Sequence, residues 1–202
     1  MEMDPETAKL LDALLPHTGF DGWTRQALRH ALISLGRDPN EAPLLFASAA
    51  DMIEAAFALG DQRMIEEAAG LEGGLTARVR AVVALRLEQM AGGKEAIRRA
   101  MARLALPGQA PRLARIIAAT TDSIWFAARD SSADFSWYTK RFTLSAVWAA
   151  TLLFWLSDES PESEATLAFL DRRLQGVGRI GKFRRKAQDC LTNIIPFRAA
   201  SA

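Results

Sequence analysis

A chain of 202 residues, 50% of them hydrophobic and 24% charged, has the balance of one folded domain or a compact pair, which excludes global disorder. The net charge of +1 excludes a bulk attraction to nucleic acid or to an anionic membrane. The single cysteine, Cys190, excludes an internal disulfide, and no apolar run reaches the roughly 18 residues of a membrane span.

The N-terminal segment 1–7 carries three acidic residues and no apolar run. It resembles neither a secretory signal nor an arginine-rich transit peptide. The longest apolar stretch, 146–156, is interrupted by Thr151 and is too short to cross a bilayer. We therefore expect a cytoplasmic protein of bacterial type.

Helical spacing of apolar residues runs through the whole chain, and alanine, leucine, arginine and glutamate fill the segments between breakers. Pro16 is expected to end the first helix, Gly36 with Pro39 the second, and Pro161 to start a late one. The fold class is therefore all-α. The predicted helices are 6–15, 24–35, 40–46, 48–59, 61–70, 76–91, 94–105, 110–129, 133–157, 162–175 and 178–195.

The first helices are short and joined by tight turns, whereas the later ones are longer. This asymmetry predicts a helix-turn-helix-like N-terminal unit over 1–60, a larger helical bundle over 61–177 and a separate C-terminal helix over 178–202.

No catalytic constellation is present: the sequence has no phosphate-binding glycine loop, no nucleophile elbow and no histidine-rich metal spacing. Di-iron bundles need Glu-x-x-His pairs, and neither His17 nor His30 has a glutamate three residues before it. We interpret both histidines as structural residues and expect no catalytic residue and no metal site. The chain is not expected to be an enzyme.

A helix-turn-helix unit raises the possibility of DNA binding. Recognition helices need Lys and Arg to neutralise phosphates. The candidate stretch 39–46 has one acidic residue and no basic residue, and the following helix adds Asp51 and Glu54. We therefore expect no binding to nucleic acid.

The long helix 133–157 has two apolar faces at 100° per residue. One face holds Phe135, Phe142, Ala149 and Leu153, and the other holds Trp137, Leu144, Trp148 and Trp155. Such a helix is either buried on both sides in a bundle, or gives one face to the core and the other to a dimer mate or partner. Near its start, Trp137 and Tyr138 are close in sequence to Asp134, Lys140 and Arg141, a composition typical of binding hot spots.

The last helix has a narrow apolar stripe beside a strongly basic face, and residues 179–198 hold six basic residues and one acidic residue. This pattern is typical of a helix that lies on a membrane surface, although docking on its own bundle or on a dimer mate is the alternative. The residues predicted to contact the membrane are Ile180, Lys182, Phe183, Arg184, Arg185, Lys186, Leu191 and Ile194.

A longer motif adds a specific resemblance. Residues 134–141 read Asp-Phe-Ser-Trp-Tyr-Thr-Lys-Arg, followed by Asp-Glu-Ser-Pro-Glu at 158–162 and Thr-Leu-Ala-Phe-Leu-Asp-Arg-Arg at 166–173. Together with Gly-Trp-Thr at 22–24 and Arg-Leu-Glu at 86–88, these strings resemble the TetR-like lipid-binding family of coenzyme Q (ubiquinone) biosynthesis. The resemblance extends over about 16–175.

The resemblance implies a TetR-like homodimer that has lost DNA binding. It implies a lipid ligand, an isoprenoid or ubiquinone precursor, rather than a catalytic cofactor. It also implies a partner, the di-iron demethoxyubiquinone hydroxylase, contacted through Asp134, Trp137, Tyr138 and Arg141. The location would be peripheral to the inner membrane, on the matrix side in a mitochondrion.

An elongated apolar pocket is expected in the bundle, because alanine-rich helices leave room beside large side chains. Its predicted walls are Met90, Leu113, Ile117, Ile124, Phe142 and Leu170. Two other functions remain open at this point: a TetR-type transcriptional regulator with an apolar effector pocket, and a membrane-surface scaffold with no ligand.

Overall fold

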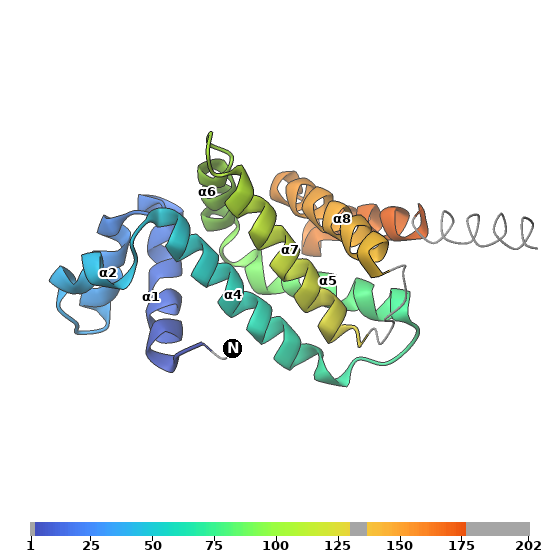
Figure 1. Cartoon of the computed structure of the whole chain (residues 1–202), viewed down its shortest axis with the longest axis horizontal. Helices are drawn as coiled ribbons and strands as arrows, with labels where there is room; N and C mark the ends of the chain where they lie inside the picture. The colour runs from blue at the N-terminus through green and yellow to red at the C-terminus, as the bar shows by residue number, and fades with distance from the viewer. Residues whose placement is uncertain (1–2, 130–136, 177–202) are drawn as a thin grey trace, which may run out of the picture.

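A computed structural model describes residues 3–129 and 137–176, and of 137–140 it describes the backbone alone. Every regular element within these ranges is a helix (Figure 1), which confirms the all-α prediction. In chain order the elements are α1 (Pro5–Asp21), α2 (Arg25–Ser34), η1 (Pro39–Glu41), α3 (Ala42–Leu45), α4 (Ala49–Glu67), η2 (Ala68–Gly70), α5 (Leu75–Ala91), α6 (Lys94–Leu104), α7 (Ala110–Ala127), α8 (Trp137–Ser157) and η3 (Pro161–Ser163). After η3 the chain is helical again over 164–176.

Side-chain caps fix where several helices begin, as their sequences suggest. Asp4 accepts a hydrogen bond from the Thr7 amide, Thr24 from the Ala27 amide and Ser48 from the Asp51 amide. Each cap satisfies an amide that has no partner inside its helix. These local signals explain why the starts of α2 and α4 lie close to their predicted positions.

α1 and α2 form a small unit at one end of the molecule, and α4 leads from it across the bundle beside α7 (Figure 1). The Trp23 indole between α1 and α2 donates a hydrogen bond to the Ala96 carbonyl at 2.8 Å, which ties this unit to α6. The prediction that Pro16 ends the first helix is wrong. Pro16 lies inside α1, where the buried Leu14 and Thr18 on either side hold the helix against its neighbours.

α4 is a single helix, so the predicted break near Gly60 is also wrong, and the predicted domain boundary after residue 60 lies inside α4. The glycine has a tertiary cause. A Cβ at Gly60 would lie only 2.5–2.6 Å from the guanidinium of Arg86, so α5 approaches α4 closely only because this position has no side chain.

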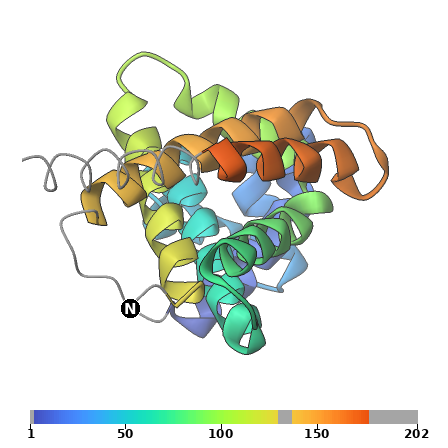
Figure 2. The same cartoon turned by 90° about the vertical axis from the view of Figure 1, so that its right-hand side faces the viewer.

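α8 has the two apolar faces that the sequence predicted. Leu144, Trp148 and Trp155 are buried in the core, whereas Phe142 is 79% exposed and Leu153 is 62% exposed. Phe154 stacks on Phe169 with ring centroids 4.7 Å apart, so α8 and the segment 164–176 lie side by side (Figure 2). Within one chain α8 is therefore not buried on both sides, and a dimer mate or partner on its outward face stays a prediction.

Asp158 organises the turn between α8 and the segment 164–176. Its carboxylate accepts hydrogen bonds from the Thr166 amide at 2.8 Å, the Thr166 hydroxyl at 2.5 Å and the Ser160 amide at 2.8 Å. Burial acts to raise the pKa of Asp158, but the hydrogen bonds from Thr166 and Ser160 outweigh it and hold that pKa well below its ordinary value. The Asp-Glu-Ser-Pro motif is thus a helix-capping turn.

Replacing Asp158 with alanine should lower the free energy of unfolding by about 1–3 kcal/mol at pH 7, because the buried Thr166 amide and hydroxyl lose their acceptor. Since the folded-state pKa is depressed, this contribution is complete above the unfolded-state pKa and is lost as the pH falls. The difference from wild type should therefore shrink below about pH 4 in urea titrations. Asp171→Ala, which breaks an exposed pair with Arg80, is the control and should cost less than about 1 kcal/mol. Equal losses in the two variants would contradict the capping role.

Candidate functional site

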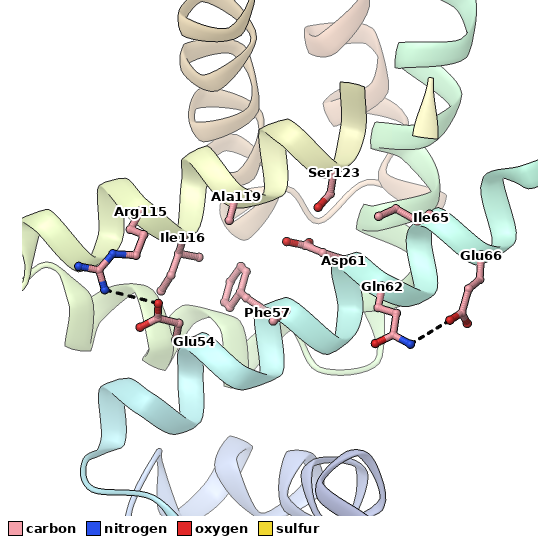
Figure 3. A pocket seen from close by; sticks show the side chains of 11 residues that line it. Glu54, Phe57, Asp61, Gln62, Ile65, Glu66, Arg115, Ile116, Ala119 and Ser123 are labelled. Atoms are coloured by element: carbon pink, nitrogen blue, oxygen red, sulfur yellow. Dashed lines mark hydrogen bonds and ion pairs between the residues drawn. The ribbon is translucent and has the colours of Figure 1, made fainter. Parts of the chain in front are cut away.

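A cavity of about 530 Å³ opens between α4 and α7 (Figure 3). Phe57 and Ile116 lie between the two helices and are buried, and Ile65 is half-buried. The small side chain of Ala119 keeps the α7 side of the cavity open. The residues that line the cavity are Glu54, Phe57, Ala58, Asp61, Gln62, Ile65, Glu66, Arg115, Ile116, Ala119 and Ser123.

Charged side chains close one end of this cavity. Glu54 pairs with Arg115 at 3.6 Å and with Arg112 at 3.7 Å, and Arg112 also binds Asp51 at 2.5 Å. These ion pairs join α4 to α7 and lie nearer to solvent than the buried Phe57 and Ile116. The cavity thus has an apolar interior with a polar rim, the usual composition of a small-molecule site.

A buried ion pair lies behind the cavity. The Arg86 guanidinium from α5 donates to the Asp61 carboxylate at 3.0 Å and to the Phe57 carbonyl at 3.3 Å. The Thr120 hydroxyl from α7 donates to the second carboxylate oxygen at 2.8 Å. Because the side chains of Asp61 and Arg86 are only 8% and 4% exposed, this network joins α4, α5 and α7 with little access to water.

Burial dominates the electrostatics of the pair. It raises the pKa of the Asp61 carboxyl above its ordinary value, although the charge of Arg86 and the hydrogen bond from Thr120 act in the opposite direction. Burial likewise lowers the pKa of Arg86, against the attraction of Asp61. The two charges therefore depend on each other, since burial leaves each with little solvation by water.

A second cavity, of about 510 Å³, lies among α1, α4, α5 and α6. Arg86 and Phe57 line it, so the buried pair separates the two cavities. Its wall is otherwise largely apolar and includes Trp23 and Met90. The side-chain amide of Gln89 also lines this cavity, and it has no hydrogen-bond partner within the described part of the protein.

The six residues predicted to form a lipid pocket do not line one cavity. Met90 lines the second cavity, Ile124 and Leu170 are fully buried in the core, and Leu113 and Ile117 pack partly buried against that core. Phe142 as a pocket wall is wrong. It is 79% exposed because the opposite face of α8, with its two tryptophans, packs inward.

The predicted partner and membrane residues fall mostly outside the described side chains. Asp134 and all the membrane-contacting residues from Ile180 to Ile194 lie outside the described residues, and Trp137 and Tyr138 have a described backbone only, in the first turn of α8. Arg141 forms an ion pair with Asp122 of α7. In the described ranges no single helix is long and apolar enough to cross a membrane, and only the pair Pro39–Leu45 and Ala49–Gly70, bent by 83°, reaches that length and composition together.

The central residues of the site, Asp61 and Arg86, were not predicted from the sequence. The sequence does not single them out, because the surrounding segments hold other charges: Asp51, Glu54 and Arg63 accompany Asp61, and Arg80 and Glu88 accompany Arg86. A glycine directly before Asp61 was interpreted as a helix break, although a helix interior can require glycine for close packing.

Comparison with known proteins supports the resemblance predicted from the motifs. A family model described as COQ9 matches residues 110–181. The chain is 27% identical over 183 residues to the human "Ubiquinone biosynthesis protein COQ9, mitochondrial", an alignment that covers 86% of this chain and 58% of that protein. The Drosophila melanogaster protein of the same name is 32% identical over 187 residues, with 86% of this chain and 55% of that protein covered. The chain thus spans less than two thirds of the length of these relatives.

A solved structure shows the same fold. The crystal structure of the TetR transcriptional regulator from Nitrosomonas europaea ATCC 19718 superposes with a TM-score of 0.67, covering 85% of this chain and 97% of that one. At 23% identity this likeness concerns the fold alone. It confirms the TetR-like helical bundle, and together with the COQ9 matches it confirms the predicted resemblance.

Asp61→Asn should lower the free energy of unfolding by about 3–5 kcal/mol, because it keeps the side-chain shape but leaves the buried Arg86 charge uncompensated. Urea unfolding at pH 7 measures this. Asp12→Asn, which removes the charge from an exposed pair with Arg63, is the matched control and should cost less than about 1 kcal/mol.

The double variant Asp61→Leu with Arg86→Met tests the cause. It should recover part of the stability lost in Asp61→Asn, since it leaves no single buried charge. A double variant less stable than Asp61→Asn would mean that the hydrogen-bonded pair itself, rather than the relief of a lone charge, stabilises the bundle.

Proposed function

From this relationship to the COQ9 proteins, we propose that the chain is a non-enzymatic accessory protein of ubiquinone biosynthesis. In this proposal it binds an isoprenoid or quinone-precursor lipid at a membrane surface and presents it to the demethoxyubiquinone hydroxylase. Two named relatives are ubiquinone biosynthesis proteins, and the motifs at 134–141 and 158–162 are those on which the resemblance was based.

The observation that carries the lipid-binding proposal is the cavity between α4 and α7. Its volume of about 530 Å³ lies within the usual range of roughly 300–1,000 Å³ for small-molecule sites. An isoprenoid tail would pack on Phe57, Ile65 and Ile116. Oxygen atoms of a ring would lie near the rim, where Arg115 and Gln62 offer hydrogen-bond donors.

The fold is compatible with the alternative of a transcriptional regulator, but the charge of the candidate DNA-reading stretch 39–46 is not. In this chain the position of a recognition helix is held by the four-residue α3, which follows the single turn η1. Leu44 in α3 is 86% exposed, and residues 39–46 contain no basic side chain. Nothing in this stretch would neutralise phosphates, so we do not propose DNA binding.

The outward face of α8 supports two protein contacts. We assign its N-terminal part, around Phe142 and Arg141, to the hydroxylase, and its C-terminal part, around Leu153, to a homodimer formed together with the segment 164–176. Exposed aromatic and arginine side chains are enriched at binding hot spots. Ala165 and Ala168 are exposed beside α8, and such small side chains let two helices approach closely.

A membrane-peripheral location completes the proposal. The basic segment 179–198 would attract anionic lipid headgroups, with roughly 1 kcal/mol for each basic side chain near the surface. The surface would be the cytoplasmic face of the inner membrane in a bacterium and the matrix face in a mitochondrion. A scaffold without a ligand would share this location, and lipid binding separates the two ideas.

Ala119→Trp should block the cavity between α4 and α7, because the added ring fills the space above Phe57 and Ile116 without entering the core. The affinity for a short-chain ubiquinone should fall at least roughly tenfold. Equilibrium dialysis measures it, because this method does not depend on the protein fluorescence that the added tryptophan changes. Lipid that co-purifies with the wild-type chain, detected by native mass spectrometry, should be lost.

The control for this variant is Ala118→Trp, at an exposed neighbouring position of α7 that does not line the cavity. It should bind lipid as the wild type does. If Ala119→Trp retains full binding, the lipid does not occupy this cavity, and the apolar second cavity becomes the site to block.

Phe142→Glu should leave the thermal unfolding temperature unchanged, because the side chain is already exposed, and should weaken binding to the hydroxylase at least roughly tenfold. Biolayer interferometry with the purified hydroxylase measures the affinity. Ile33→Glu changes another exposed apolar residue, on α2 and 58% exposed, and should have no effect. Equal affinities of all three proteins would remove the N-terminal part of α8 from the interface.

A further inference from the structure

The two histidines of the chain lie next to each other in the folded protein, although thirteen positions separate them in the sequence. His17 is on α1 and His30 on α2, and their ring centroids are 5.6 Å apart with planes inclined by 58°. Asp21, one turn after His17 on α1, joins them, and its carboxylate oxygen lies 2.9 Å from Nδ1 of His30. One potential metal-ligand atom from each of the three residues lies within 4.8 Å of the others.

Local structure explains why His17, Asp21 and His30 lie close together. His17 and Asp21 are four residues apart, so they project from the same face of α1. The helix ends at Asp21, and Gly22, with a φ of 69°, turns the chain back so that Thr24 can cap α2. α1 and α2 then pack against each other, which places His30 over the last turn of α1.

The three side chains are of the right chemical kind for a transition metal. Imidazole nitrogens and a carboxylate oxygen are the donors of many zinc sites, and three protein ligands leave a fourth position for water. The last turn of α1 also carries the negative end of the helix dipole, which favours a cation. We propose that His17, Asp21 and His30 form a divalent-metal site of the Zn²⁺-binding type that clamps α1 to α2.

The geometry requires only a small adjustment. In a tetrahedral site with metal–ligand bonds of about 2.0–2.1 Å, ligand atoms lie roughly 3.3 Å apart. His30 and Asp21 are already this close, so His17 supplies most of the movement, by rotation of a side chain that is only partly buried. Coordination by His30 Nδ1 and the Asp21 carboxylate would replace the 2.9 Å hydrogen bond between them with two bonds to the metal.

The inference goes beyond the proposed lipid-binding function and does not rest on it. The site is at the α1–α2 turn, and none of its three residues lines either cavity described above. Metal binding would stabilise the N-terminal helical unit by linkage, since the unfolded chain does not hold the three donors together.

The test uses the full chain with no affinity tag, because a histidine tag would itself bind metal. Isothermal titration with Zn²⁺ should give one site per chain with a dissociation constant on the order of micromolar. Co²⁺ should produce the visible absorption bands of a tetrahedral site. Zn²⁺ should also raise the thermal unfolding temperature.

The variants His17→Gln, His30→Gln and Asp21→Asn should each weaken Zn²⁺ binding at least roughly tenfold and abolish the thermal shift. Asp21→Asn can keep a hydrogen bond to His30, so its loss of binding would not be a folding defect, and circular dichroism checks this for all three. Cys190→Ser removes the one thiol of the chain and should bind Zn²⁺ as the wild type does.

Three outcomes would overturn the proposal: a dissociation constant weaker than about 1 mM, unchanged affinity in His17→Gln, or loss of binding in Cys190→Ser. The first would leave the Asp21–His30 contact as an ordinary hydrogen bond between two helices. The second would exclude His17 as a ligand, and the third would place the metal elsewhere in the chain.

Discussion

The buried contact between Asp61 and Arg86 constrains most of the bundle. Removing the two charges from water costs several kcal/mol for each. Their mutual attraction offsets this cost, together with the hydrogen bond from Thr120 to Asp61 and that from Arg86 to the Phe57 carbonyl. α4, α5 and α7 must therefore keep one relative position, because a small displacement would leave a charge without a partner. Gly60 is part of the same constraint, since the guanidinium occupies the space of a side chain. The two cavities lie on either side of this fixed point.

α8 shows how one helix can serve a core and a surface at once. Trp148 and Trp155 are among the largest fully buried side chains of the described residues, and the Lys94 ammonium group lies 5.0 Å from the centroid of the Trp155 ring. Lys94 and Arg98 also donate to carbonyls at the end of α8. With this end held by α6 and Asp158, the helix can present Phe142 and Leu153 to solvent without losing its position.

The similarity to a TetR regulator concerns the fold, and a shared fold does not by itself specify a function. The helical framework is shared, yet the stretch that would read DNA is short, apolar and without basic residues. The α1–α2 unit carries instead a cluster of two histidines and an aspartate. The chemistry of a chain with this fold must therefore be sought in its cavities and exposed faces.

The sequence by itself determined the helical class, most helix boundaries and the amphipathic character of α8, because periodicity, caps and glycine or proline at helix ends are local properties. It did not determine that α1 continues through Pro16 or that α4 continues through Gly60, since packing against neighbours outweighs the local preference at both positions. It also could not decide which apolar face of α8 turns inward, which placed Phe142 in the wrong environment. The contacts of Asp61 with Arg86 and of Asp21 with His30, and the proximity of His17, involve residues of different helices. Such contacts depend on how helices cross, which only the tertiary structure decides.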